Sequence, residues 1–157
     1  MRKKNKSYLF FLIFFFYIFF TFNFSFSDEN INFLSLKNEE VNLRTGPSFD
    51  HPIKFIYKKK YLPVIILDQS GPFRKIKDFE HNTGWIHIAL LSKKKTAINM
   101  KNNSILLKKP TIYSKPIARL ESGRLVLIKK CKQKWCKISS GEFIGWINKS
   151  FLWGRVN

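Results

Sequence analysis

The sequence predicts an all-β protein in which two similar small barrels follow an N-terminal hydrophobic segment. The first observation is a repeat, because Gly84-Trp85-Ile86 returns as Gly145-Trp146-Ile147, 61 residues later. The second is that apolar runs of four to seven residues alternate with turn-forming stretches such as DQSGP, DFEHNTG and SSGE. The third is that no stretch after the hydrophobic segment sustains the 3.6-residue period of an amphipathic helix. Units of about 55 residues with this pattern fit small antiparallel barrels of about five strands.

Residues 1–27 have the pattern of a signal peptide. A basic start, MRKKNK, precedes an apolar run from Tyr8 to Phe22, and SFS offers the small-x-small pattern for cleavage. An uncleaved anchor is the alternative, because Phe24 and Phe26 extend the apolar run toward the ~20 residues that span a membrane. In both cases the basic flank stays inside, and we expect the rest of the chain to be exported to the periplasm or cell envelope.

The exported part is strongly basic. Residues 28–97 carry 12 basic and 8 acidic side chains, whereas residues 98–157 carry 13 and 2. This balance favours an anionic partner such as a membrane surface, an acidic cell-wall polymer or nucleic acid, although export disfavours nucleic acid. The composition, rich in Lys, Asn, Ile and Phe, is equally typical of an AT-rich genome. Both explanations stay open at this point.

The two repeats align over most of the exported chain. With a shift of 61 to 62 residues, Val64 falls on Val126, Phe73 on Trp135 and Ile76 on Ile138. Upstream, VNLRTGPSFDHPIKFIY faces ILLKKPTIYSKPIARL. A repeat of this extent predicts that each half folds as the same small unit.

The residues resemble a known family. The run VNLRTGPSFDHPI, followed by an aromatic-x-x-Ile strand and by Gly-Trp-Ile, resembles the bacterial SH3 (SH3b) domain, and the second copy resembles a degenerate partner. The tandem resembles exported double-SH3 proteins of Gram-negative bacteria. The resemblance implies two SH3-like β-barrels, at residues 39–92 and 104–155, and the short segment 93–103 between the repeats is expected to be a linker.

In such a barrel, Gly-Trp-Ile would form the fourth strand and be followed by a single 3₁₀ turn. Period-two alternation places Ile86 and Ile147 in the barrel cores and Trp85 and Trp146 on the opposite faces. We expect each Trp to cover the outer face, to pack between the repeats or to contact a ligand.

The sequence gives little support for an enzyme. Its two thiols, Cys131 and Cys136, lie in the second repeat, whereas His51, His81 and His87 lie in the first. The acidic residues are scattered, and there is no Gly-rich phosphate loop or Gly-x-Ser-x-Gly elbow. We therefore predict no catalytic residue, no cofactor and no metal site.

The segment CKQKWC is expected to contain a disulfide. Val126–Lys130 should turn back into Trp135–Ser139 as a hairpin, which brings Cys131 and Cys136 within bonding distance across the strands. An even number of cysteines in an exported protein is typical of an oxidised pair. Two free thiols or a zinc site are the alternatives, but Cys-x₄-Cys without a third ligand nearby is weak support for zinc.

The resemblance to SH3 domains also implies where a ligand would bind. In the first repeat the ligand-facing aromatic positions fall on Phe49 and Phe73, and the 3₁₀ turn has His87 where SH3 domains have Pro. In the second repeat the candidates are Tyr113, Trp135 and Phe151, with Asn148 at the Pro position. This departure disfavours Pro-rich ligands. The second repeat is the better candidate because it keeps three aromatics and carries more positive charge; the alternative is that these rings only fill a small barrel.

These observations favour a non-enzymatic binding module of the cell envelope. It would recognise peptidoglycan, as peptide or glycan, or an envelope protein or peptide. The alternative is a basic adaptor held by charge on anionic membrane or polymer surfaces. The two differ in salt response, because charge-driven binding weakens as ionic strength rises.

Overall fold

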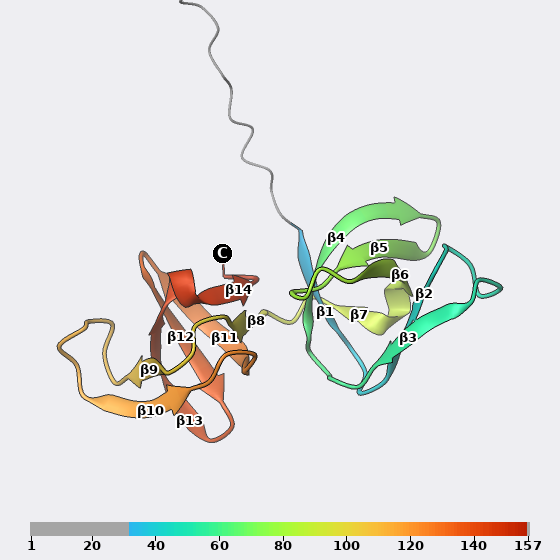
Figure 1. The fold of residues 1–157 in the computed structure, drawn as a ribbon. Coiled ribbons are helices and arrows are strands. Elements are labelled where there is room, and N and C mark those ends of the chain that lie inside the picture. The colour runs from blue at the N-terminus through green and yellow to red at the C-terminus, as the bar shows by residue number, and fades with distance from the viewer. Residues whose placement is uncertain (1–31, 157) are drawn as a thin grey trace, which may run out of the picture. The chain divides into compact units, whose positions relative to one another are not determined.

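The computed structural model describes residues 32–156, which form two seven-stranded antiparallel sheets with the same topology (Figure 1). The first sheet has the strand order β3-β2-β6-β5-β4-β1-β7, and the second has the order β10-β9-β13-β12-β11-β8-β14. Each strand of the second sheet thus occupies the place of the strand seven positions earlier. The all-β fold and the repeat are confirmed, and residues 1–27 lie outside the described part of the chain.

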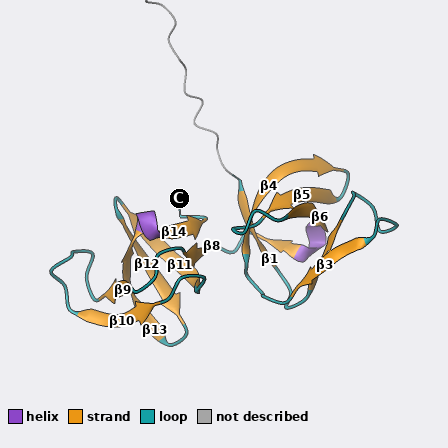
Figure 2. Cartoon of the chain, viewed as in Figure 1, coloured by secondary structure: helices purple, strands orange, loops and turns teal. Residues whose placement is uncertain are grey.

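The bounds of the strands in the first sheet are β1 (Phe33–Leu36), β2 (Val41–Arg44), β3 (Ile53–Tyr57), β4 (Pro63–Ser70), β5 (Phe73–Lys77), β6 (Thr83–His87) and β7 (Leu91–Ser92). Those in the second are β8 (Thr96–Asn99), β9 (Ser104–Leu107), β10 (Pro116–Leu120), β11 (Leu125–Lys132), β12 (Trp135–Ser140), β13 (Phe143–Asn148) and β14 (Leu152–Gly154). Two 3₁₀ turns, η1 (Ile88–Leu90) and η2 (Lys149–Phe151), each precede the last strand of their sheet, as predicted (Figure 2).

Each sheet curls around a core to which all seven of its strands contribute. In the first core, Leu43, Ile76 and Ile86 are completely buried. In the second, Leu106, Ile138 and Ile147 take the equivalent places and are also completely buried. Full burial of such a side chain contributes about 1.5–3 kcal/mol. The prediction that Ile86 and Ile147 fill the cores is confirmed.

Two strands lie outside the ranges that the sequence assigned to the repeats. β1 precedes residue 39 and pairs with β4 and β7. β8 lies within the segment 93–103 that was expected to be a linker, yet it pairs with β11 and β14 as a strand of the second sheet. Its four residues are all buried. Neighbouring side chains of β8 reach different cores, with Ala97 in the second core and Ile98 in the first.

A search for membrane-spanning helices among residues 32–156 finds no helix of sufficient length and apolar character.

Candidate functional site

The Gly-Trp-Ile segments lie on β6 and β13, where a neighbouring strand approaches closely. A Cβ atom at Gly84 would lie 2.7 Å from the Arg44 carbonyl oxygen, and one at Gly145 would lie 2.8 Å from that of Leu107. Real Cβ atoms do not come so close, so both positions require glycine. The repeated glycines allow β2 and β9 to close each barrel against β6 and β13.

Trp85 and Trp146 occupy the outer faces of their own sheets, opposite the buried isoleucines, and both are half-buried. Trp85 lies across from Lys75 on β5 and from Arg44 on β2. The ring contact between the repeats comes from another residue, Trp153, whose ring centroid lies 5.0 Å from that of Phe33. Of the roles expected for Trp85 and Trp146, the structure therefore shows coverage of the outer face.

In the first repeat the three candidate ligand residues form one cluster. The ring centroids of Phe49 and Phe73 are 5.2 Å apart, those of Phe73 and His87 are 5.2 Å apart, and those of Phe49 and His87 are 5.4 Å apart. Phe73 is 4% exposed and forms the base, whereas Phe49 is 64% exposed. We call these three side chains the aromatic cluster; it presents the Phe49 ring to solvent on a fixed support.

The loop that carries Phe49 is held by Arg44 at the end of β2. Its Nη1 donates hydrogen bonds to the carbonyl oxygens of Phe49 at 2.9 Å and of His51 at 2.8 Å. The guanidinium carbon also lies 5.5 Å from the centroid of the Phe49 ring. Within the loop, the hydroxyl of Ser48 lies 2.9 Å from His51 Nδ1. These bonds fix Phe49 against Phe73 of β5 and His87 at the end of β6.

The three candidates of the second repeat are not brought together in this way. Tyr113 is 91% exposed, and Trp135 and Phe151 are half-buried. No contact between these three rings is found within the described residues, and the ring of Phe151 instead lies 4.3 Å from the ammonium of Lys101. The position equivalent to Arg44 is Leu107, since each lies opposite its repeat's Trp on the neighbouring strand. Leucine cannot donate to loop carbonyls, which explains why the Tyr113 loop has no equivalent brace.

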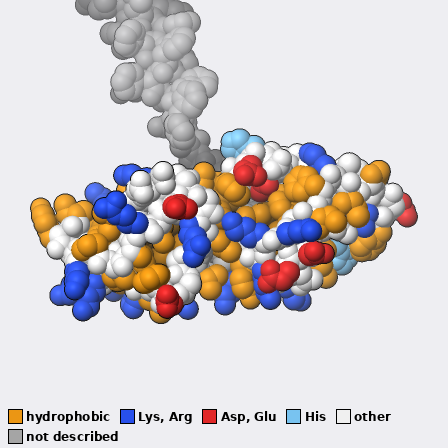
Figure 3. Space-filling view, turned by 60° about the horizontal axis from the view of Figure 1, so that its bottom comes forward, with side chains coloured by type: hydrophobic (Ala, Val, Ile, Leu, Met, Phe, Trp, Pro, Cys, Tyr) orange, Lys and Arg blue, Asp and Glu red, His pale blue; other side chains and the backbone are white. Residues whose placement is uncertain are grey.

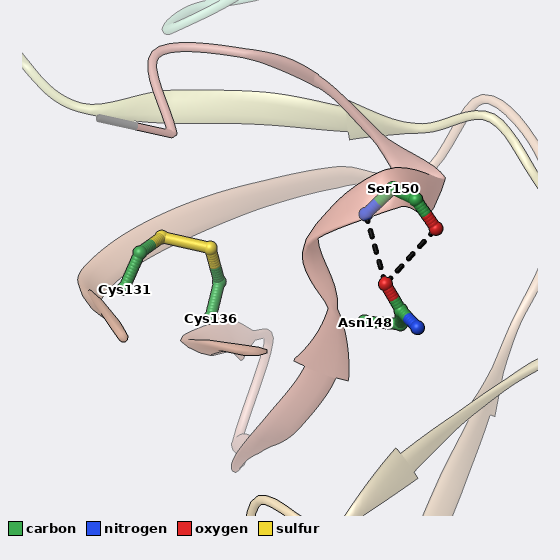
Figure 4. The surroundings of a disulfide bond; sticks show 4 residues. All are labelled: Cys131, Cys136, Asn148 and Ser150. Carbon is green, nitrogen blue, oxygen red and sulfur yellow. Dashed lines mark hydrogen bonds between the residues drawn. A yellow bond between two sulfur atoms is a disulfide. The ribbon is translucent and has the colours of Figure 1, made fainter. Parts of the chain in front are cut away.

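The residues at the expected Pro positions cap the 3₁₀ turns. His87 Nδ1 accepts a hydrogen bond from the Ala89 amide at 3.2 Å. Asn148 Oδ1 accepts bonds from the amide and the hydroxyl of Ser150, at 3.0 and 2.9 Å (Figure 4). Asparagine is a preferred capping residue, so this role could have been read from the sequence.

The predicted disulfide joins Cys131 to Cys136, which lie directly opposite each other on β11 and β12 (Figure 4). The prediction of a hairpin closed by a disulfide is confirmed. Cys136 is completely buried and belongs to the second core. The bond thus connects the hairpin to that core and leaves no free thiol among residues 32–156.

A buried carboxylate that sequence reasoning missed organises the turn between β5 and β6. Asp78 is 1% exposed and accepts hydrogen bonds from the amides of Glu80 and Asn82, from the Asn82 side chain and from the hydroxyl of Tyr57 at 2.9 Å. Burial, and then the hydrogen bond and negative charge of Asp78, raise the pKa of Tyr57 well above its ordinary value. These hydrogen bonds all lie within the first repeat and satisfy the carboxylate, so Asp78 has a structural role.

Positive charge surrounds a cavity of about 350 Å³ beside the disulfide hairpin. Its lining is Lys95, Ile128, Lys129, Lys130, Cys131, Gln133, Lys149 and Val156, and contains no acidic side chain. In the space-filling view, Lys and Arg side chains are spread among hydrophobic ones over the visible face (Figure 3). Within residues 32–156, no group of three or more His, Cys, Asp or Glu side chains is placed to hold a metal ion.

The solved structures that are similar to this chain include two from Trichomonas vaginalis. The structure of NlpC2 is 15% identical, with a TM-score of 0.37, over 81% of this chain and 49% of that chain. The structure of NlpC1 is 14% identical, with a TM-score of 0.36, over 80% of this chain and 46% of that chain. The chain thus spans about half the length of either structure. A search of curated proteins found no match.

The family comparison matches each half of the chain separately. The model of the bacterial SH3 domain matches residues 37–93 and again residues 100–154. These two matches cover most of the chain and coincide with the two sheets of identical strand order. The chain therefore belongs to the bacterial SH3 domain family, of which it contains two copies in tandem.

Proposed function

We propose that the chain is a non-enzymatic binding module of the cell envelope, and that it recognises a peptide of peptidoglycan or of an envelope protein. The observation that carries this proposal is the aromatic cluster of the first repeat. There, Phe49 exposes 64% of its surface while it rests on Phe73 and His87. Membership of the bacterial SH3 domain family supports a binding role.

The cluster is suited to ligand binding because its rings are already in place. Arg44 bonds two carbonyls of the Phe49 loop, so little conformational entropy remains to be lost when a ligand covers the ring. A large aromatic surface fixed in this way is the usual centre of an interaction site. In the second repeat, Tyr113 is more exposed but has no such support, so the first repeat is the better candidate on structural grounds.

The placement of the reactive groups supports a non-enzymatic role. Cys131 and Cys136 are bonded to each other, which removes the candidate nucleophiles. The buried carboxylate of Asp78 is occupied by four hydrogen bonds. The proposed location in the periplasm or envelope is supported by the basic and apolar pattern of residues 1–27, and by a disulfide, which persists in oxidising compartments.

The experiment is co-sedimentation of residues 28–157, which contain every described strand, with purified peptidoglycan sacculi across a salt series. Phe49→Ala should weaken the affinity for sacculi at high salt by about thirtyfold or more, since truncation of an aromatic hot spot typically costs 2 kcal/mol or more. Tyr113→Ala is the matched control, because it removes the exposed aromatic at the equivalent loop position of the second repeat. It should bind as the wild type does.

Two outcomes would count against the proposal. If Phe49→Ala binds normally while Tyr113→Ala does not, the ligand site lies in the second repeat. If neither the wild type nor any variant binds sacculi at any salt concentration, the proposal that the ligand is peptidoglycan is wrong. The same proteins should then be tested against envelope proteins.

The second candidate function is a basic adaptor on anionic surfaces. It is favoured by the 13 basic and 2 acidic side chains of residues 98–157. Retention on sacculi that disappears with salt and is insensitive to Phe49→Ala would support this function instead, because screening weakens contacts between exposed charges.

A further inference from the structure

We propose that the outer face of strands β11, β12 and β13 binds an acidic polysaccharide. This surface, here named the lysine face, consists of Lys130, Lys132, Trp135, Lys137 and Trp146. It lies in the second repeat and is separate from the aromatic cluster. The proposal does not depend on the peptide-binding function proposed above.

The register of the sheet sets these side chains in two rows. In one row Lys130 lies opposite Lys137, which in turn lies opposite Trp146. In the other, Lys132 lies opposite Trp135. Alternate residues of a strand share a face, and the residues between them, including Cys136, Ile138 and Ile147, are completely buried in the core. The five members of the lysine face therefore point outward together.

The first repeat has an equivalent row of three residues, in which one acidic and one basic side chain lie opposite each other. There, Asp68 lies opposite Lys75, and Lys75 lies opposite Trp85. The acidic residue at the start of the row is replaced by Lys130 in the second repeat. The comparison within one chain shows that the barrel accommodates a neutral cross-strand pair at this place, so two lysines are not required by the fold.

Two lysines directly opposite each other are unfavourable without an anion between them. Their Cβ atoms are about 4.5–5.5 Å apart in such a pair, and like charges at that separation destabilise a sheet. Within residues 32–156 the described contact of the Lys130 ammonium is with the Trp146 ring, at 5.8 Å, and no ion pair is found for Lys130 or Lys137. A carboxylate or other anionic group bound between the two ammonium groups would remove the repulsion.

The two tryptophans of the lysine face indicate that the ligand also has flat apolar surfaces. Trp135 and Trp146 are half-buried on the lysine face, so each presents part of a flat apolar ring beside the ammonium groups. Sugar rings have apolar faces that fit such a surface. All the cations of the lysine face are lysines, which bind as point charges and lack the fork of arginine that suits nucleic-acid recognition. A chain of sugars with acidic groups matches these features best.

The space beside the lysine face is also suited to an anionic chain. A cavity of about 350 Å³ at the disulfide hairpin is lined by Lys129, Lys130 and Gln133 together with the core-side residues Ile128, Cys131 and Val156, so it meets the lysine face only at Lys130. Gln133 offers an amide at the turn of the same hairpin. Lys130 therefore belongs both to the row with Lys137 and to the lining of a cavity that holds further positive charge.

The test uses titration of the protein with polygalacturonate, a carboxylated polysaccharide, with neutral dextran and a single-stranded oligonucleotide as comparison probes. The decisive variant is Lys130→Asp, which creates in the second repeat the Asp-to-Lys pair of the first. It should keep the thermal midpoint of the wild type or raise it, and weaken polygalacturonate binding by about tenfold or more. Lys58→Asp is the matched control, since it changes net charge equally at an exposed position of the other repeat. Its affinity should change by about twofold or less.

The outcomes separate the lysine face from general charge and from the aromatic cluster. Equal weakening by Lys130→Asp and Lys58→Asp would overturn the proposal, because net charge alone would then explain binding. Tighter binding of the oligonucleotide than of polygalacturonate, lost in Lys130→Asp, would also overturn it in favour of nucleic acid. Normal polygalacturonate binding by Phe49→Ala would support it and show that this site is independent of the proposed peptide site.

Discussion

Within each Gly-Trp-Ile segment, three neighbouring residues have three different roles. Gly145 permits the close approach of β9, Trp146 covers the outer face and Ile147 fills the core. The alternation of Trp and Ile could be predicted because strands have a period of two. The need for glycine could not, because it depends on a strand about 40 residues earlier in the chain, whose approach only the folded barrel reveals.

The burial of Asp78 and its hydrogen bonds could likewise not be predicted from the sequence. The sequence DFEHNTG indicates a turn, but nothing in it shows that Asp78 is buried or that Tyr57, on β3, donates a hydrogen bond to it. A buried carboxylate of this kind is stabilised by several donors at once. Its partners come from both the local turn and a distant strand.

The Tyr57–Asp78 pair predicts a pH dependence of stability. Because the pKa of Tyr57 is raised above its ordinary value of 10.0, the folded chain keeps this proton where the unfolded chain has released it. The contribution of Tyr57 is therefore complete below pH 10.0 and is lost as pH rises above that value, by about 1.4 kcal/mol per pH unit. Denaturant unfolding at a series of alkaline pH values should show this slope in the wild type.

The variant Tyr57→Phe isolates the effect. At neutral pH it should unfold with about 2 kcal/mol less free energy, since it loses a hydrogen bond to a charged acceptor. Above pH 10.0 the difference from the wild type should narrow, because Phe has no proton to lose. Tyr113→Phe changes a ring that is 91% exposed and should follow the wild type throughout. A constant difference at all pH values would contradict the assignment.

Among the elements, strands with a strong apolar pattern were predictable and short ones were not. The hairpin of β11 and β12 was expected from its apolar runs and its cysteines, and is confirmed. β8 falls in the segment 93–103 that the sequence predicts to be a linker, since Thr96–Asn99 has only four residues and follows a run of three lysines. It is a strand because both of its faces are buried by tertiary contacts, which a local pattern does not reveal.

The local sequence pattern also does not reveal which repeat holds its loop aromatic in place. Phe49 and Tyr113 occupy equivalent loop positions in the sequence, yet only Phe49 is held against its barrel. The difference lies in the residue opposite the Trp, which is Arg44 in one repeat and Leu107 in the other. Choosing between the repeats from the sequence would have required knowing that Arg44 reaches the loop carbonyls.

The disulfide between β11 and β12 is expected to stabilise the folded chain. Replacing both cysteines by alanine should lower the free energy of unfolding by about 2 kcal/mol, because closing so short a loop restricts the unfolded chain only moderately. Guanidinium unfolding with and without reductant measures this. The wild type should lose a similar amount on reduction, while the double variant should not respond. Equal stability of reduced and oxidised wild type would contradict the prediction.

At the scale of the whole molecule, several residues of the second repeat contact the first repeat or the segment that follows it. The Trp153 ring on β14 packs edge-on against Phe33, at 5.0 Å, and lies 6.4 Å from Phe79. Arg155 donates a hydrogen bond to the Lys93 carbonyl at 3.1 Å, and Gly123 accepts one from Lys59 at 3.3 Å. Together with Ile98, which lies in the first core, these contacts indicate that the repeats stabilise each other.

Trp153→Ala tests this coupling. Removing a half-buried indole that packs on two aromatic rings should cost about 2–4 kcal/mol, most of it at the contact between the repeats. We expect calorimetry to show one unfolding transition for the wild type and two for Trp153→Ala, because each barrel retains its own core. Trp135→Ala removes a tryptophan from the same barrel without a described ring contact to the first repeat, and should keep the single transition. If Trp153→Ala also unfolds in one transition at the wild-type temperature, the assignment of the coupling to Trp153 is wrong, and Ile98→Ala, which alters the residue of β8 in the first core, becomes the next variant to test.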